Sequence, residues 1–227
     1  MIRWARAVIL AVSATAIVTS ATTVSAPSAV AHGRHHHPHF YQGWLLRKVG
    51  QFYLGDSTNP LFAALTGDCG QLIHGVFYMA APIDVGVELD CTVPAWTPIV
   101  LSPAAWFATQ GIDGDTDQEL EAAAATGFNT STDWLTLDGK NVPLRTTITG
   151  AYNVRSEPGS FYDAILGVGT GRIRTALVGN VVLFRHLSRG DHVIESAVSF
   201  VPAGNGDYSA TYHIHVGGWW SRSAEKV

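Results

Sequence analysis

The stretch Leu72-Ile73-His74-Gly75-Val76-Phe77-Tyr78-Met79 lies between Cys69 and Cys91, the two cysteines of the chain, within the segment Asn59 to Pro103. Successive residues of a strand point to opposite faces, and both faces of this stretch are apolar. That pattern is typical of a strand covered on two sides. We expect a central strand of a β-sandwich, with His74 half-buried and hydrogen-bonded.

The amino terminus has the pattern of a secretory signal peptide over residues 1–31. Arg3 and Arg6 precede an apolar run from Ala7 to Val18, and Ala29-Val30-Ala31 forms a small-x-small cleavage site. Cleavage after Ala26 is an alternative. No later apolar run reaches the roughly 18 residues that a membrane span needs, so the sequence predicts secretion and no membrane span.

Export favours one disulfide between Cys69 and Cys91 over two free thiols. Closing a loop of this length stabilises a fold by roughly 3 kcal/mol in the chain-entropy model.

The composition is that of a turn-rich all-β protein, with 23 glycines, 10 prolines and 14% charged residues. The formal charge of −4 provides no basic field for a phosphate backbone, which argues against nucleic acid as a partner.

Turn signals every 8–12 residues predict an antiparallel β-sandwich of jelly-roll type with one short helix. We place this single domain at residues 44–220, between a His-rich flexible segment at 32–43 and a tail at 221–227. The predicted elements include one short strand within Phe40–Tyr53, a helical turn at Leu61–Leu65, a strand from Cys91 through Leu101, a hairpin at Asp138-Gly139, a strand pair within Leu144–Val154, a long strand at Arg174–Leu187 and strands at His192–Phe200 and Tyr208–Val216.

Alternate carboxylates in a turn are hard oxygen ligands and raise the hypothesis of a calcium site at Asp113, Asp115 and Asp117. An EF-hand loop is excluded, because Gln118 and Ala124 stand where that loop needs Gly and Glu. A capping box of Thr116 and Glu119, opening a helix that ends at Gly127, explains the segment better.

Histidines raise the hypothesis of a divalent-metal site, since neutral imidazoles are common ligands of zinc and copper. His213 and His215 lie at i and i+2, on one face of the predicted strand, opposite Tyr212, Ile214 and Val216. The alternative is that these two histidines simply form the polar, solvent-facing side of an outer strand. The other candidates are His186, His192 and, at the start of the mature chain, His32.

A glycine-dotted segment from Ser156 to Gly171 is long for a connection, which makes it a candidate ligand loop. Its candidate residues are Phe161, Tyr162, Gly167 and Gly169.

Nine short segments carry a resemblance to other proteins: Asn59-Pro60, Thr66–Cys69, Gln71, Gly75–Ala80, Cys91–Ala95, Leu135–Gly139, Tyr152–Ser156, Leu187–Ile194 and Thr211–Val216. Together they resemble a broad family of secreted bacterial proteins of actinobacterial type. The resemblance implies a secreted β-sandwich and brings no activity with it.

Three functions stay open. The first is a non-enzymatic binding module for an extracellular glycan or surface, supported by five aromatic candidates: Trp96, Trp106, Trp134, Trp219 and Trp220. The second is a metal-dependent enzyme or metal carrier that uses the histidines. The third is a secreted effector.

Overall fold

The computed structural model describes residues 38–58, 67–82, 84–128, 130–200 and 207–217. Except for Pro38, these residues belong to the compact unit His39–Val227, to which the description is confined. The predicted signal peptide, His32, the helical turn at Leu61–Leu65, Trp219, Trp220 and the tail lie outside the described residues.

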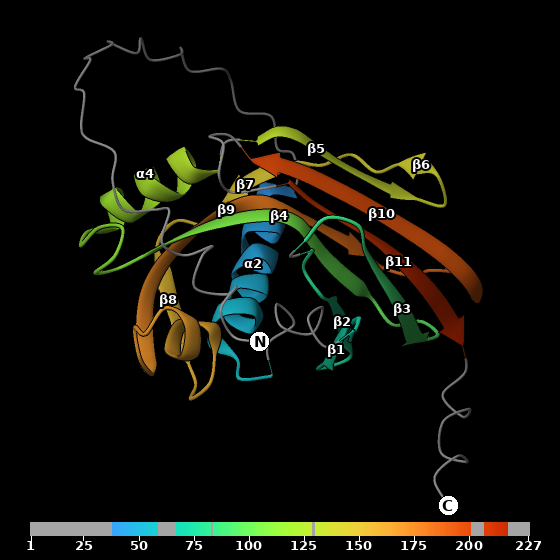
Figure 1. Cartoon of the computed structure of the whole chain (residues 1–227), viewed down its shortest axis with the longest axis horizontal. Helices are drawn as coiled ribbons and strands as arrows, with labels where there is room; N and C mark the ends of the chain where they lie inside the picture. The colour runs from blue at the N-terminus through green and yellow to red at the C-terminus, as the bar shows by residue number, and fades with distance from the viewer. Residues whose placement is uncertain (1–37, 59–66, 83, 129, 201–206, 218–227) are drawn as a thin grey trace, which may run out of the picture. The chain divides into compact units, whose positions relative to one another are not determined.

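Two sheets form the unit (Figure 1). The first sheet has the order β1-β2-β4-β9-β7, and β8 also pairs with β9. The second has the order β3-β11-β10-β5-β6. The strands of the first sheet are β1 (Gly70–Ile73), β2 (Val76–Met79), β4 (Ile99–Thr109), β7 (Thr146–Ile148), β8 (Tyr152–Ser156) and β9 (Gly171–Phe184). Those of the second are β3 (Val87–Pro94), β5 (Thr130–Leu137), β6 (Lys140–Asn141), β10 (Gly190–Phe200) and β11 (Asp207–Gly217).

The predicted β-sandwich is therefore confirmed, but its sheets are mixed rather than purely antiparallel. β2 pairs in parallel with β4, and β11 pairs in parallel with β3. The reason is the path of the chain, which leaves the first sheet after β2, adds β3 to the second sheet and then returns as β4. Strands joined by such a crossover can lie parallel, whereas strands joined by a tight hairpin cannot.

The main core fills the space between the sheets. On β11 the predicted alternation is confirmed: Tyr212, Ile214 and Val216 are buried, and the two intervening histidines face away from the core. Tyr212 also donates a hydrogen bond to the carbonyl oxygen of Ala80, 2.8 Å away, so its hydroxyl is satisfied inside the core.

The segment predicted as a short strand is instead helix α2 (Pro38–Gly50), continued by the π-helical turn η2 (Gln51–Gly55). Leu45, Leu46 and Val49 repeat at helical spacing and are buried against the outer face of the first sheet, in a cluster that includes Val100 and Leu177. A dense mixture of aromatic and aliphatic residues fits both a strand and a helix, so the sequence pattern did not distinguish them. Since α2 begins at Pro38, the boundary predicted at residue 44 falls inside it.

The apolar run from Leu72 to Met79 is two strands, not one central strand. β1 and β2 form a hairpin that turns at His74 and Gly75, both with positive φ (48° and 78°). His74 is consequently exposed at the turn rather than half-buried. β2 is the second strand of its sheet, next to the edge strand β1.

β3 and β4 are separate strands in different sheets, although a single strand was predicted there. β4 continues to Thr109 past Pro103 because the strand carries a bulge between Leu101 and Ala104. A proline inside a strand is tolerated at a bulge, where ladder hydrogen bonds are already interrupted.

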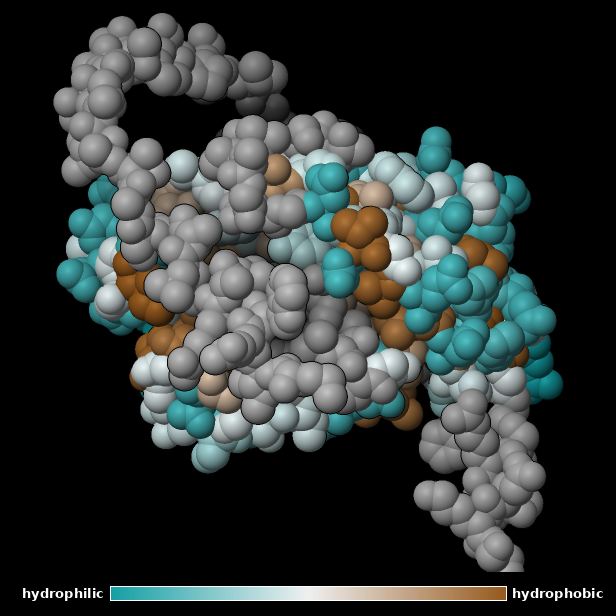
Figure 2. Space-filling view, viewed as in Figure 1, coloured by the Kyte–Doolittle hydropathy of each residue, from teal (hydrophilic) through white to brown (hydrophobic). Residues whose placement is uncertain are grey.

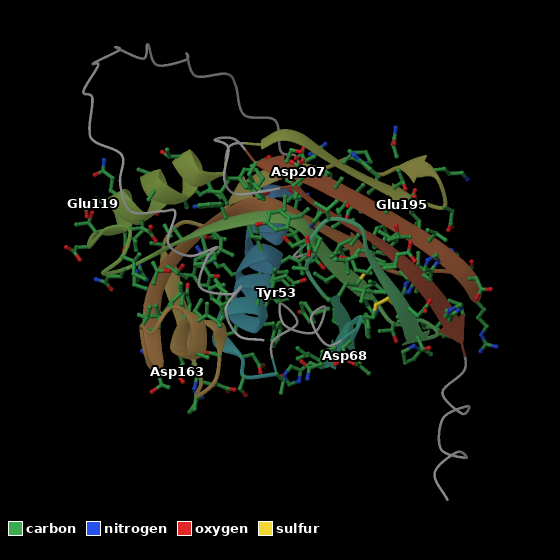
Figure 3. The ribbon with its side chains drawn as sticks, in the orientation of Figure 1. Tyr53, Asp68, Glu119, Asp163, Glu195 and Asp207 are labelled. Atoms are coloured by element: carbon green, nitrogen blue, oxygen red, sulfur yellow. A yellow bond between two sulfur atoms is a disulfide. The ribbon has the colours of Figure 1, made fainter. Side chains whose placement is uncertain are left out.

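The predicted disulfide between Cys69 and Cys91 is confirmed (Figure 3). Cys69 directly precedes β1 and Cys91 lies in β3, so the bond joins the edge strands of the two sheets. Both cysteines are buried.

Helix α4 (Asp117–Gly127) confirms the predicted capping box. The Thr116 hydroxyl accepts the Glu119 N–H, and the Glu119 carboxylate accepts the Thr116 N–H. Leu120 and Ala124 pack against Ala176 of β9. These residues form a hydrophobic cluster of their own, separate from the core between the two sheets.

Candidate functional site

An open groove with a volume of about 280 Å³ lies between α2 and one end of the first sheet. Helix α2, β2, the start of β4, the end of β9 and the β9–β10 loop all contribute to it. The lining residues are Tyr41, Trp44, Leu45, Val76, Tyr78, Pro98, Val100, Leu183, Arg185 and His186. None of these described lining residues carries a carboxylate.

Helix α2 presents two aromatic rings to this groove. Because Leu45, Leu46 and Val49 anchor one side of the helix, Tyr41 and Trp44 are left on its accessible side. The two rings stack at 6.0 Å between centroids with an interplanar angle of 28°. Tyr41 is 45% exposed and Trp44 is 48% exposed, an unusual amount of aromatic surface to leave in water.

Cationic and aromatic groups surround the rings. The Lys48 ammonium lies 5.7 Å from the centre of the Trp44 ring, a cation–π distance. At the floor of the groove, burial raises the pKa of the Tyr78 hydroxyl, and the nearby Tyr41 raises it further. Tyr78 therefore offers a neutral O–H at all physiological pH values.

Trp96 stands next to the groove residue His186. It lies in the turn between β3 and β4, is 73% exposed, and contacts the His186 ring edge-on at 6.0 Å. The Trp96 φ of 68° is rare for a bulky residue, and backbone strain of this kind clusters at functional sites.

The other tryptophan candidates lie elsewhere. Trp106 is half-buried and packs against Phe200, with ring centres 5.7 Å apart. Trp134 is exposed on β5, on the outer face of the second sheet. The sequence alone does not single out Trp44 and Tyr41, which complete the groove, because the pattern of their segment fits a strand as well as a helix.

The four candidate histidines that lie among the described residues do not converge on one point. His213 and His215 point outward from β11, and His215 Nδ1 is 2.7 Å from an Asp191 carboxylate oxygen. His192 pairs with Asp138 at the far end of β5, and His186 lines the groove. Among the described residues, no group of three or more His, Cys, Asp or Glu side chains is arranged to hold a metal ion.

The three aspartates of the calcium hypothesis each have a different hydrogen-bond partner. Asp113 accepts the Thr109 N–H at 2.8 Å, and burial raises the pKa of its carboxyl group. Asp117 forms a two-point ion pair with Arg174, which lowers the pKa of the Asp117 carboxyl group. Asp115 is exposed, and its N–H donates to Glu119.

The glycine-dotted segment contains the π-helical turn η3 (Phe161–Ile165). Tyr162 is fully buried in the cluster under α2, and Phe161 packs edge-on against Phe107 at 5.6 Å. Tyr162 is therefore a core residue, and Phe161 is half-buried against the same cluster. Gly167 and Gly169 have positive φ values of 66° and 90°, which explains the need for glycine at those turns.

Hydrophilic side chains gather over the region of β6, β10 and β11 (Figure 2). This distribution agrees with the exposure of Lys140, Asp191 and His215 on those strands. In the part of the chain that the structure describes, no helix is long and apolar enough to cross a membrane.

No family model, curated protein or solved structure matches the chain.

Proposed function

We propose that the protein is an exported binding module that holds a glycan in the groove beside α2. The observation that carries this proposal is the stacked, half-exposed pair Tyr41 and Trp44 at an open groove. Aromatic faces carry partial negative charge and attract the electropositive C–H groups on the face of a sugar ring. An open groove also suits a chain that enters from one side and leaves from the other.

The polar groups of the groove are suited to sugar hydroxyls. Arg185 offers several N–H donors, His186 offers a ring nitrogen, and neutral Tyr78 offers an O–H. Because no carboxylate lines the described groove, Arg185 is also available to an acidic sugar, which it can bind through two parallel hydrogen bonds.

Export is part of the proposal and has its own support. A positive n-region, an apolar run and a small-x-small site precede the domain. The disulfide between Cys69 and Cys91 fits an oxidising compartment. The family resemblance, which implies secretion, points in the same direction.

The proposal is tested by glycan-array screening of the untagged protein, followed by calorimetric titration of any glycan that binds. Replacing Trp44 by Ala removes one stacked ring and is expected to weaken binding at least tenfold. Trp134→Ala is the matched control, since Trp134 is similarly exposed but lies on β5. An affinity that is unchanged in Trp44→Ala, or no glycan bound at all, would overturn the proposal.

A second variant distinguishes acidic glycans from neutral ones as the ligand. Arg185→Gln is expected to weaken binding of uronic-acid or sulfated glycans more than binding of neutral ones, with a corresponding loss of salt dependence. If the protein binds cultured host cells and Trp44→Ala abolishes that binding, the groove would be the site through which a secreted effector contacts its target.

A further inference from the structure

We propose that Ser188, His192 and Asp138 form a catalytic triad for hydrolysis of small carboxylic esters. Ser188 Oγ lies 3.1 Å from His192 Nε2, and His192 Nδ1 lies 2.8 Å from Asp138 Oδ2. A hydroxyl, an imidazole and a carboxylate in this order, each within hydrogen-bond reach of the next, are the signature of an activated serine nucleophile. Such triads are identified by geometry rather than by position in the sequence.

The fold holds the acid and the base rigidly. β5 and β10 pair in register up to Leu137 and Ile194, and Asp138 follows at the tip of the β5–β6 hairpin with a φ of 50°. Its N–H donates to the Val193 carbonyl oxygen at 2.8 Å, and its Oδ1 accepts the Val193 N–H at 2.9 Å. Asp138 is therefore held against the residue that follows His192.

Asp138 determines which nitrogen of His192 carries the proton. When His192 is neutral with its proton on Nδ1, that N–H donates to the Asp138 carboxylate and the Nε2 lone pair can accept from the Ser188 hydroxyl, 3.1 Å away. The His192 side chain is only 11% exposed, whereas Ser188 is exposed on the β9–β10 loop. The base is sheltered and the nucleophile is accessible.

The Ser188 carbonyl oxygen imposes a pH requirement. It lies 3.0 Å from Nε2, so a protonated His192 donates to this oxygen and cannot act as a base. The hydrogen bond to Asp138 and the contact with Ser188 raise the pKa of His192. Hydrolysis should accordingly increase as the pH rises through this raised pKa.

The reaction balances without any added group. Ser188 Oγ attacks the ester carbonyl carbon to form a new C–O bond while its proton passes to Nε2. The tetrahedral intermediate then breaks the bond to the alcohol oxygen, which leaves with the proton from Nε2. Water repeats the sequence on the acyl-serine, releasing the carboxylic acid and restoring the Ser188 hydroxyl. Because Ser188 is exposed on the loop, a small ester such as an acetyl ester can reach its hydroxyl directly.

The chain contains an internal control. His215 pairs with Asp191 at 2.7 Å on the outer face of the second sheet, where 53% of the His215 side chain is exposed. This second His–Asp pair lies on the face of the sheet, whereas the Ser188 hydroxyl is hydrogen-bonded to His192. His215→Asn is therefore expected to leave esterase activity unchanged.

The test uses the intact oxidised protein, a fluorophosphonate probe and p-nitrophenyl acetate. We expect one covalent adduct, located on Ser188 by peptide mass spectrometry, and ester hydrolysis that falls at least about 100-fold in Ser188→Ala. Asp138→Asn should lower kcat with little change in KM and should shift the pH profile. Circular dichroism checks that each variant is folded.

The absence of an adduct on Ser188, or hydrolysis in Ser188→Ala equal to that of the unmodified protein, would overturn the triad. The triad and the glycan groove use different side chains. Trp44→Ala therefore should not affect hydrolysis of p-nitrophenyl acetate, and Ser188→Ala should not affect glycan affinity, so failure of either proposal is distinguishable from failure of the other.

Discussion

Asn180 of β9 donates a hydrogen bond to the Asp133 carboxylate of β5, which crosses from the first sheet to the second with an N···O distance of 2.5 Å. Asn180 is fully buried. On its face of β9, Val178 packs under α4, whereas Val182 packs against the core between the sheets. The pair thus marks the boundary at which one hydrophobic cluster gives way to the other.

We predict that Asn180→Ala lowers the free energy of unfolding by about 1–3 kcal/mol, because the half-buried Asp133 carboxylate loses a charge-assisted donor. Urea denaturation followed by tryptophan fluorescence measures the change. A midpoint equal to that of the unmodified protein would show that water replaces the amide at no cost.

Reduction of the disulfide is expected to lower the free energy of unfolding by roughly 3 kcal/mol, since the bond joins two edge strands through cysteines with a sequence separation of 22. Denaturation of the Cys69→Ala, Cys91→Ala double variant provides the measurement, with the oxidised protein as reference. Stability that does not differ between the two would contradict a structural role for the bond.

The pair His192 and Asp138 predicts a defined pH window of stabilisation. Hydrogen bonding to Asp138 raises the pKa of His192 above its ordinary value of 6.5, so this contribution is complete below that value and is lost as the pH rises through the folded-state pKa. The bond from His192 lowers the pKa of Asp138 below 3.8, so its contribution is complete above that value and is lost as the pH falls through the folded-state pKa.

The Tm difference between the unmodified protein and Asp138→Asn should therefore be largest from about pH 4 to pH 6.5 and should shrink on both sides. Differential scanning fluorimetry across pH checks this. Asp191→Asn, which removes the more exposed pair with His215, is the control and should show a smaller maximum. A Tm difference for Asp138→Asn that is constant with pH would contradict the assigned hydrogen bond.

Helix α2 is predicted to be an integral part of the fold. Leu46 is fully buried between α2 and the first sheet, so Leu46→Ala should lower the free energy of unfolding by about 2–5 kcal/mol. Tyr41→Ala, on the exposed side of the same helix, is the matched control with an expected loss below about 1 kcal/mol. Equal effects of the two substitutions would mean that α2 does not pack as described.

The sequence by itself determined the features that depend on local pattern or simple arithmetic. The capping box of Thr116 and Glu119 placed α4, strict alternation identified β11 and its buried face, and two cysteines left one pairing. Each of these signals is contained in a short segment, and nothing distant competes with it.

Only the tertiary structure decided the groove and the triad. The residues from Phe40 to Tyr53 suit a strand as well as a helix, and packing against Val100 and Leu177 selects the helix that exposes Tyr41 and Trp44. Asp138 is 54 residues from His192, and no local pattern joins them. Their contact exists because β5 and β10 pair in one register, and register is a property of the folded sheet.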